Sequence, residues 1–257
     1  MRWSPTFLIA GTALAVAVAG CGSNGQSSGS DPTTQAGSST PTGSTLPQGS
    51  EPANLDPTEF TTNIDNPYWP LNPGSTWVYR EVEDGVTQTV VVTVTDRTKV
   101  VDGVTARVIH DVVSTGGEPI EKTYDWYAQD SAGNVWYLGE DTKEYENGKV
   151  SSTTGSWEAG VGGAEAGVIM PADPKPGLSY RQEYDKGNAE DRASVVSVDA
   201  HTTVPFGSFN QVLETRDVNP LERNFVEQKY FARGVGPIET IQISGGQAHE
   251  QLLSYRP

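Results

Sequence analysis

The segment Asp125–Val150, DWYAQDSAGNVWYLGEDTKEYENGKV, carries two turn signals between runs that alternate in polarity. Asp130–Gly133 places Asp at the first position and Gly at the fourth position of a type I turn. Asn147-Gly148 is the dipeptide most typical of a tight hairpin turn. The segment therefore predicts two β-hairpins that share one strand, Val135–Glu146.

Counting outward from the first turn predicts the register of these strands. Tyr127 falls opposite Tyr137, and Glu121 falls opposite Lys143, an opposite-charge pair that supports this pairing. Alternation then sorts the side chains by face. The more apolar face is expected to pack on the core: Tyr124, Trp126, Ala128, Trp136 and Leu138. The other face is expected to meet water or a cleft: Thr123, Asp125, Tyr127, Val135, Tyr137 and Asp141.

The same pattern of short runs and turn residues continues on both sides of this segment. Asp84-Gly85 and Asp102-Gly103 separate runs that are rich in Val and Thr. Further strands are expected near 178–184, 189–200, 208–218, 224–232, 237–244 and 248–255. The fold class is therefore all-β, an antiparallel meander of about twelve strands. A sheet of that size curls into a half-barrel or barrel, or splits into two layers, to protect its edges.

Two further features concern the arrangement of the domain, which is expected to span 57–257. Pro73-Gly74 and Pro176-Gly177 each precede a similar run, which leaves open two similar halves, 70–157 and 175–257. Between them lies a long irregular segment, Gly155–Gly177. Such segments in compact domains are often lids or binding loops. This one contains Trp157 and several aliphatic residues, so it either packs through its own apolar side chains or covers a cavity.

The N-terminus has the features of a secretion signal. Arg2 precedes an apolar run, Phe7–Gly20, that is too short to cross a bilayer as a helix. The run ends in VAGC at Cys21, the only cysteine. Residues 21–56 are rich in Gly, Ser, Thr and Pro and are expected to form a disordered tether. If Cys21 carries lipid, the folded part contains no disulfide.

Composition limits the partners. After removal of a signal at 1–20, 16 Lys and Arg remain against 33 Asp and Glu. So acidic a chain is a poor partner for nucleic acid. The three histidines lie on separate predicted strands, and no P-loop, zinc or EF-hand spacing is present, so no cofactor or metal is predicted. A non-EF calcium site at Asp125 and Asp141 remains open. With this many acids, some carboxylate pair always fits a glycosidase, so that signal carries little information.

Three motifs carry a resemblance to a known group: NPYWPLNPGSTWVY, DWYAQDSAGNVWYLGED and VPFGSFNQVLET with EQKYFARGVGPIE. They resemble secreted bacterial lipoproteins that are common in actinobacteria, and VAGC resembles the lipobox of such proteins. The resemblance implies a diacylglyceryl group on Cys21, a membrane-anchored protein on the extracytoplasmic face, and a β-meander. It supplies no catalytic residues.

These observations favour a non-enzymatic binding protein for an apolar or amphipathic ligand such as a lipid. The ligand would lie in the curved sheet, under Gly155–Gly177. One alternative is a carbohydrate- or cell-wall-facing module, in which aromatic rings stack on a sugar. A second alternative is a hydrolase with an unrecognised carboxylate site. The candidate ligand-binding residues are Tyr127, Tyr137, Asp125, Asp141 and Trp157.

Overall fold

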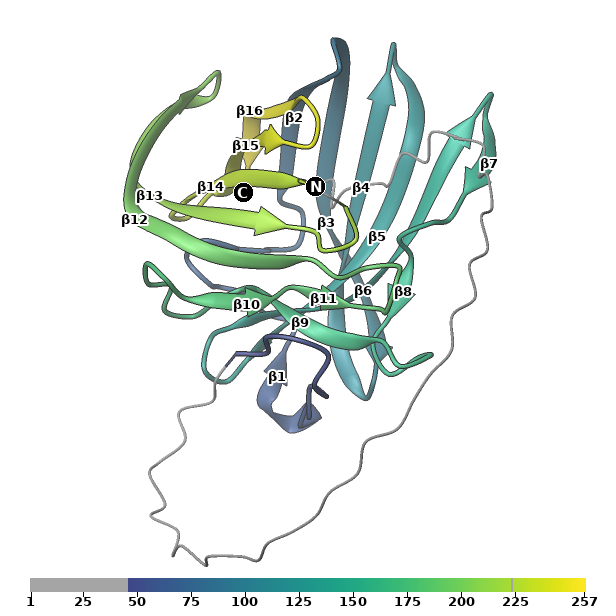
Figure 1. The fold of residues 1–257 in the computed structure, drawn as a ribbon, viewed down its shortest axis with the longest axis vertical. Coiled ribbons are helices and arrows are strands. Elements are labelled where there is room, and N and C mark those ends of the chain that lie inside the picture. The colour runs from purple at the N-terminus through teal and green to yellow at the C-terminus, as the bar shows by residue number, and fades with distance from the viewer. Residues whose placement is uncertain (1–45, 223) are drawn as a thin grey trace, which may run out of the picture. The chain divides into compact units, whose positions relative to one another are not determined.

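Alternating Val, Thr and aromatic residues form a single large antiparallel sheet (Figure 1). This computed structural model describes residues 46–222 and 224–257. Its elements are η1 (Pro57–Glu59), β1 (Phe60–Thr61), β2 (Thr76–Glu83), β3 (Val86–Val101), β4 (Val104–Thr115), β5 (Glu118–Asp130), β6 (Val135–Glu146), β7 (Lys149–Ser152), β8 (Trp157–Glu158), β9 (Glu165–Met170), β10 (Ser179–Arg181), β11 (Glu183–Tyr184), β12 (Arg192–Val204), β13 (Gly207–Val218), β14 (Val226–Ala232), β15 (Gly236–Ser244) and β16 (Ala248–Arg256).

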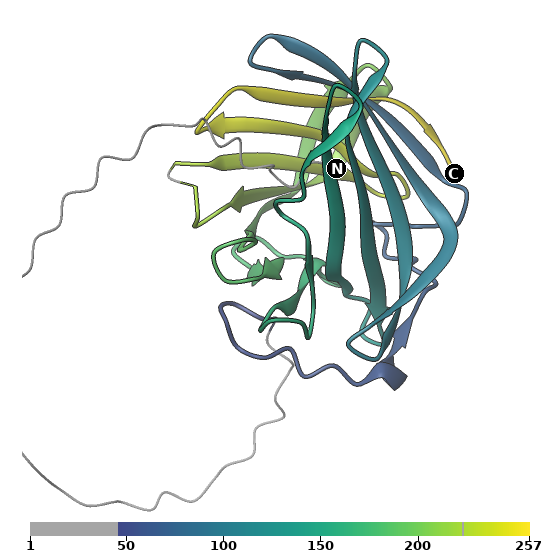
Figure 2. The ribbon, with the colours of Figure 1, turned by 90° about the vertical axis from the view of Figure 1, so that its right-hand side faces the viewer.

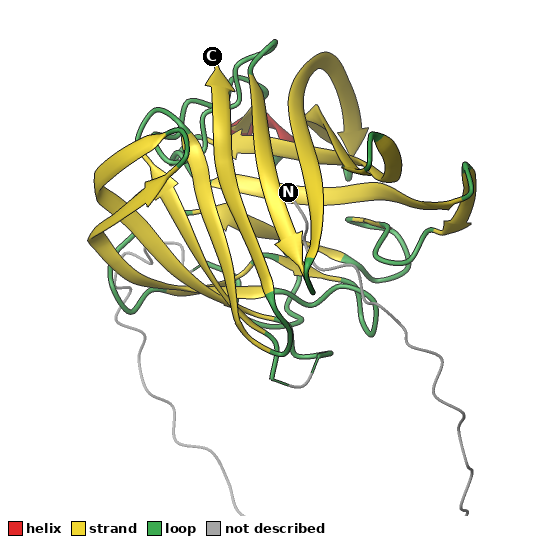
Figure 3. Cartoon of the chain, turned by 90° about the horizontal axis from the view of Figure 1, so that it is seen from above, coloured by secondary structure: helices red, strands yellow, loops and turns green. Residues whose placement is uncertain are grey.

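The strand order brings the two ends of the sheet together. Hydrogen bonding runs β10-β12-β13-β14-β15-β16-β2-β3-β4-β5-β6-β9-β11, with β1, β7 and β8 attached at the side. The terminal strands β10 and β11 are neighbours in sequence, so residues 179–184 bridge β12 and β9. The sheet therefore curls into a nearly closed barrel (Figure 2 and Figure 3). The all-β antiparallel prediction is confirmed.

The sheet has sixteen strands rather than about twelve, partly because the segment Gly155–Gly177 is more regular than predicted. It contains β8 and β9, and β9 extends the sheet beside β6. Val168, Ile169 and Met170 are almost completely buried. The apolar residues of this segment therefore form part of the barrel wall and its core, and the segment is not a lid.

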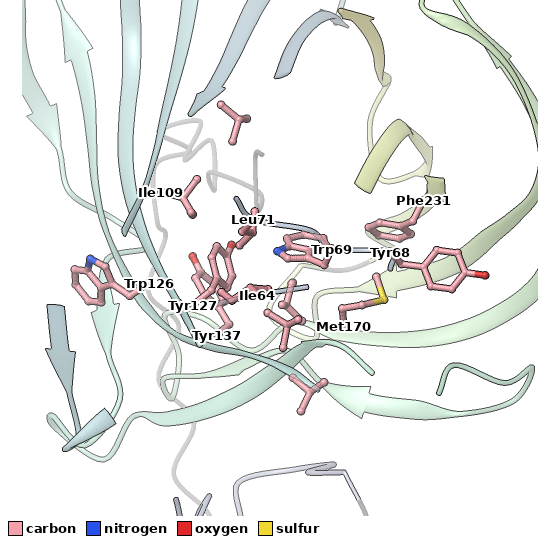
Figure 4. Close-up of a cluster of buried hydrophobic side chains, with 14 of the residues drawn as sticks. Ile64, Tyr68, Trp69, Leu71, Ile109, Trp126, Tyr127, Tyr137, Met170 and Phe231 are labelled. Atoms are coloured by element: carbon pink, nitrogen blue, oxygen red, sulfur yellow. The ribbon is translucent and has the colours of Figure 1, made fainter. Parts of the chain in front are cut away.

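Residues 64–71 lie across one end of the barrel and form its floor. An antiparallel bridge between Ile64 and Leu71 holds a loop that places Trp69 inside (Figure 4). The Trp69 ring lies 5.9 Å from the ring of Tyr127 on β5 and 5.8 Å from that of Phe231 on β14. One indole thus joins distant parts of the sheet. Such rings stabilise a core through their large buried area.

Arg181 fastens the start of the described chain to the barrel seam. Its side chain is buried and donates to the carbonyl oxygens of Gly49, Glu51 and Ala166, the last two at 2.7 and 2.6 Å. The backbone N–H of Arg181 donates to Pro47 O at 2.7 Å. Residues 46–56 were predicted to belong to the disordered tether, but they pack on the sheet. Within 46–222 and 224–257, no helix is long and apolar enough to cross a membrane.

Candidate binding face inside the barrel

The inward face of the sheet is apolar near the floor and acidic further along. Register follows one row of side chains across seven strands: Val195, Thr215, Lys229, Thr240, Glu250, Glu81 and Gln88. The next row toward the floor on β16, β2 and β3 is Leu252, Tyr79 and Val90. Polarity therefore changes within one row of the same face.

The acidic part continues over the other strands. In one row, Val92 pairs with Asp111, and the row continues across the next strands with Thr123 and Thr142. In another row, Val94 pairs with Ile109, and the row continues with Asp125, Glu140 and Trp157. We call the following ten residues the acidic face, and each is at most 8% exposed: Glu81, Asp111, Glu121, Asp125, Glu140, Glu183, Asp191, Asp217, Glu227 and Glu250. Buried carboxyls are rare unless paired, so their number here calls for an explanation.

The most tightly organised part of the acidic face is a phenol between two carboxyls. The Tyr137 hydroxyl lies 2.8 Å from Asp125 Oδ1 and 2.7 Å from Glu140 Oε2. A phenol has one hydrogen and donates to only one of them, so the other must carry a proton and donate to the phenol oxygen. Burial raises the pKa of Asp125 to about 6, and burial together with the Asp125 charge raises the pKa of Glu140 well above its ordinary value. Glu140 is therefore the group that holds the proton.

Aromatic rings surround this phenol. The rings of Tyr127 and Tyr137 stack at 4.8 Å, and Trp157 meets Tyr137 edge-on at 5.3 Å (Figure 4 shows both tyrosines). Trp157 Nε1 donates to Glu183 Oε2 at 2.9 Å. Burial and the nearby acids Asp191 and Glu140 raise the pKa of Glu183 well above its ordinary value. Glu183 thus connects the two parts of the acidic face.

The second part surrounds Lys229. Its ammonium lies 3.2 Å from Asp217 Oδ2 and 3.2 Å from Glu227 Oε2, and all three side chains are buried. Burial lowers the pKa of Lys229, but the neighbouring carboxylates outweigh burial and hold the pKa above its ordinary value. Burial raises the pKa of Asp191 to about 8 even though Lys229 opposes the shift. Asp191 therefore holds a proton at neutral pH.

Four of the five predicted site residues meet inside the barrel: Tyr127, Tyr137, Asp125 and Trp157. Asp141 does not, since it lies outside the barrel and pairs with Lys143 at 2.6 Å. The face that was predicted to meet water or a cleft mostly points into the barrel. On the other face, which was predicted to pack on the core, Trp126 points outward and is covered by the ammonium of Lys99, 3.2 Å from its ring centroid.

A β-bulge explains the misplaced acid. Between the pairs Asp125–Glu140 and Tyr127–Tyr137, β5 has one residue while β6 has two. The extra residue reverses the alternation on β6, so Glu140 points inward in place of Asp141. The predicted Glu121–Lys143 pair is wrong for the same reason, because Glu121 pairs with Glu144. The Tyr127–Tyr137 register, which lies before the bulge, is confirmed.

Gly139 is the residue that permits the bulge. Its φ is +133°, and a Cβ there would lie 2.3 Å from the Trp157 carbonyl oxygen. A glycine inside a strand often marks a bulge, so this signal was available in the sequence. The acids on β11, β13, β14 and β16 carried no local signal, since only barrel closure brings them together.

The acidic face shows no metal centre. Among the residues that the structure describes, no group of three or more His, Cys, Asp or Glu side chains is arranged to hold a metal ion. The carboxyls are distributed along several strands and do not converge on one point. Cys21 and the predicted signal lie outside the described residues.

Comparisons with known proteins give little more. No protein-family model and no curated protein matches the chain. Among solved structures, it is similar to a "putative lipoprotein" from Parabacteroides distasonis ATCC 8503, with 13% sequence identity and a TM-score of 0.40. The match covers 74% of this chain and 98% of that chain. Likeness at this level carries no argument about function, and the actinobacterial resemblance stays a prediction.

Proposed function

We propose that the chain is a lipid-anchored extracytoplasmic binding protein that holds an amphipathic ligand inside its barrel. The observation that carries the proposal is the change of polarity along the inward face, from Tyr79 and Leu252 to Glu81 and Glu250. A ligand with an apolar part and a polar end matches such a face. The VAGC sequence at Cys21 supports the anchor.

The interior does not favour the two alternatives. A sugar platform needs exposed rings, whereas Tyr127, Tyr137 and Trp157 are at most 5% exposed. A glycosidase needs the sugar between its two carboxyls. Here the Tyr137 hydroxyl lies between the bonded oxygens of Asp125 and Glu140. The first observation counts against a sugar platform at these three rings, and the second counts against Asp125 and Glu140 as a glycosidase pair.

Ligand binding is tested with N-phenyl-1-naphthylamine, an uncharged dye that fluoresces in apolar surroundings. The Cys21→Ser chain is used, because it lacks the attachment point for lipid. We expect saturable fluorescence at one dye per chain, which dodecanol displaces and urea abolishes. A signal that does not saturate would contradict an internal site.

The anchor is tested separately in cells. A palmitate analogue with a clickable group should label the wild-type chain, and Cys21→Ser should lose the label and leave the membrane fraction. Equal labelling of both chains would overturn the anchor and leave the binding proposal standing.

A further inference from the structure

Two arginines are neighbours on the outer face of the sheet, close to the seam. Ser179 of β10, Ser194 of β12 and Arg216 of β13 form one row across three strands. Arg192 lies two residues before Ser194 on β12, so it shares the face of this row and is a diagonal neighbour of Arg216. Both arginines are exposed, so this face points away from the barrel interior.

These residues line a pocket of about 230 Å³, which we call the arginine pocket: Gln48, Ser179, Arg192, Ser194 and Arg216 belong to its wall. The side-chain amide of Gln48 is fixed there, because Nε2 donates to Ser179 O at 2.6 Å and to Leu46 O at 3.0 Å. A water molecule takes about 30 Å³ in the liquid. The pocket therefore has room for a group of several non-hydrogen atoms.

The charges of the two arginines are not compensated. In the part of the chain that the structure describes, neither guanidinium has an ion pair. Glu190 and Glu214, each two residues before one of the arginines, accept hydrogen bonds from the Gly187 N–H and from Gln228 Nε2, both at 2.9 Å. The whole chain has 33 Asp and Glu against 17 Lys and Arg, so two neighbouring arginines without a carboxylate partner are unexpected.

A third arginine does not change this balance. Arg181 is the register partner of Arg192 on β10. Burial lowers the pKa of Arg181, the charges of Glu51 and Glu165 oppose this shift, and the charge of Arg192 adds to it. Glu51 and Glu165 thus offset Arg181 itself, and the repulsion between the neighbouring guanidiniums remains. A bound anion would remove it.

The geometry of the donors indicates which anion fits. Each guanidinium has a planar fork of N–H groups that matches two oxygens of one anion. A carboxylate has two oxygens, which a single arginine already occupies. A phosphate has more oxygens, so it accepts from two arginines on neighbouring strands. It can also accept from the hydroxyl of Ser179, which is exposed at the same pocket.

We propose that the arginine pocket binds a phosphate group. The pocket lies on the outside of the barrel, so this inference goes beyond the proposed function and does not depend on a ligand in the interior. A free phosphomonoester and the phosphate of a lipid headgroup share this chemistry, and the experiment separates them.

Calorimetric titration of the Cys21→Ser chain uses glycerol 3-phosphate, with glycerol and acetate as comparisons. Sedimentation with vesicles of phosphatidylcholine, with and without phosphatidic acid, tests the headgroup. We expect glycerol 3-phosphate to bind at one per chain and glycerol not to bind. Binding to phosphatidic acid vesicles alone would support the site and assign it to a headgroup. Acetate that binds as tightly as glycerol 3-phosphate would overturn the preference for phosphate, and a chain that binds neither phosphate probe would overturn the site.

Two variants locate the site. Arg192→Gln and Arg216→Gln each remove charge-assisted hydrogen bonds and should weaken phosphate binding about tenfold or more. The matched control is Arg80→Gln, because Arg80 is also exposed and donates to Gln251 Oε1 at 3.0 Å on β16. It loses the same charge, and its affinity should stay within about twofold. Thermal unfolding confirms that each variant is folded. An equal loss in all three variants would indicate general attraction by charge and overturn the proposal.

Discussion

At the scale of single residues, the chemistry of the interior depends on how each buried polar group is satisfied. Tyr137 bonds two carboxyls with one hydroxyl, and Lys229 pairs with two others. The sequence predicted the Tyr127–Tyr137 pair from turn geometry alone. It could not assign Lys229, whose partners Asp217 and Glu227 are recognisable only when β13 and β14 lie side by side.

Tyr137→Phe removes the hydroxyl shared by Asp125 and Glu140. We expect a loss of about 1–3 kcal/mol in the free energy of unfolding at pH 7, because two buried carboxyls lose a hydrogen bond. Urea denaturation measures it. The control is Tyr124→Phe, because the Tyr124 ring stacks on His110 outside the barrel at 4.5 Å. Removing its hydroxyl should cost less than about 0.5 kcal/mol. Equal effects in the two variants would contradict the bridging role.

Lys229→Met leaves Asp217 and Glu227 without their buried cation. Breaking such a pair costs about 3–5 kcal/mol, and the cost should shrink at low pH as Glu227, whose pKa burial raises, takes up a proton. Lys143→Met is the matched control, since Lys143 and Asp141 are partly exposed and such pairs contribute about 0–1 kcal/mol. Urea midpoints of both variants at pH 5 and pH 7.5 test this, and a Lys229→Met cost that does not depend on pH would count against it.

At the scale of elements, turn residues and alternation predicted most strands, because both signals are local. The strands they missed include β1 and also β8 and β9, which belong to a glycine-rich segment without regular alternation. Their pairing is determined by contacts with β6 and with the seam. The bulge at Gly139 shows the limit of counting, since one extra residue reversed every later position on β6.

The seam depends on a second glycine. A Cβ on Gly167 of β9 would lie 2.3 Å from the carbonyl of Gln182 and 2.7 Å from that of Arg181. Gly167→Ala should therefore push residues 179–184 away from β9 and cost about 1–3 kcal/mol or more. Hydrogen exchange should increase first in β10 and β11.

Gly207→Ala is the control for this change. Gly207 begins β13, and a Cβ there would have ample room, since the nearest atom beyond its chain neighbours is a Phe209 ring carbon at 3.8 Å. We expect a change below about 0.5 kcal/mol. If Gly167→Ala and Gly207→Ala show the same hydrogen exchange in β10 and β11, the close approach at Gly167 does not stabilise the seam.

At the scale of the whole molecule, the sequence predicted an all-β barrel-like domain but not the nature of its interior. Alternation shows which residues share a face of one strand. Whether a face points into the barrel or into solvent depends on how the sheet closes. In the sequence, the residues of the acidic face are far apart and look like ordinary surface charges. They come together only when the sheet closes.

The acidic face makes stability depend on pH. Burial raises the pKa of Asp125 to about 6 and of Asp191 to about 8, and raises that of Glu140, Glu183 and Glu227. Between the ordinary carboxyl pKa and these values, the folded state holds more protons than the unfolded state. Stability is therefore greatest at low pH and falls as the pH rises toward 8, by about 1.4 kcal/mol per pH unit for each proton.

The charges that face these groups come from every neighbouring strand. Asp125 and Glu121 face Glu140, and Asp191 and Glu140 face Glu183. The groups that face Asp191 are Lys229, Glu227, Asp217 and Glu222. Thermal unfolding of the ligand-free chain at pH 5, 6, 7 and 8 should show a steadily falling midpoint. A midpoint that rises over this range would contradict the burial of these carboxyls.

The most direct test of a barrel that holds an amphipathic ligand is native mass spectrometry of the Cys21→Ser chain purified from its own host. We predict one adduct per chain, whose released ligand has an apolar part and a polar end. A chain without any adduct, or with an adduct that has no apolar part, would contradict the account.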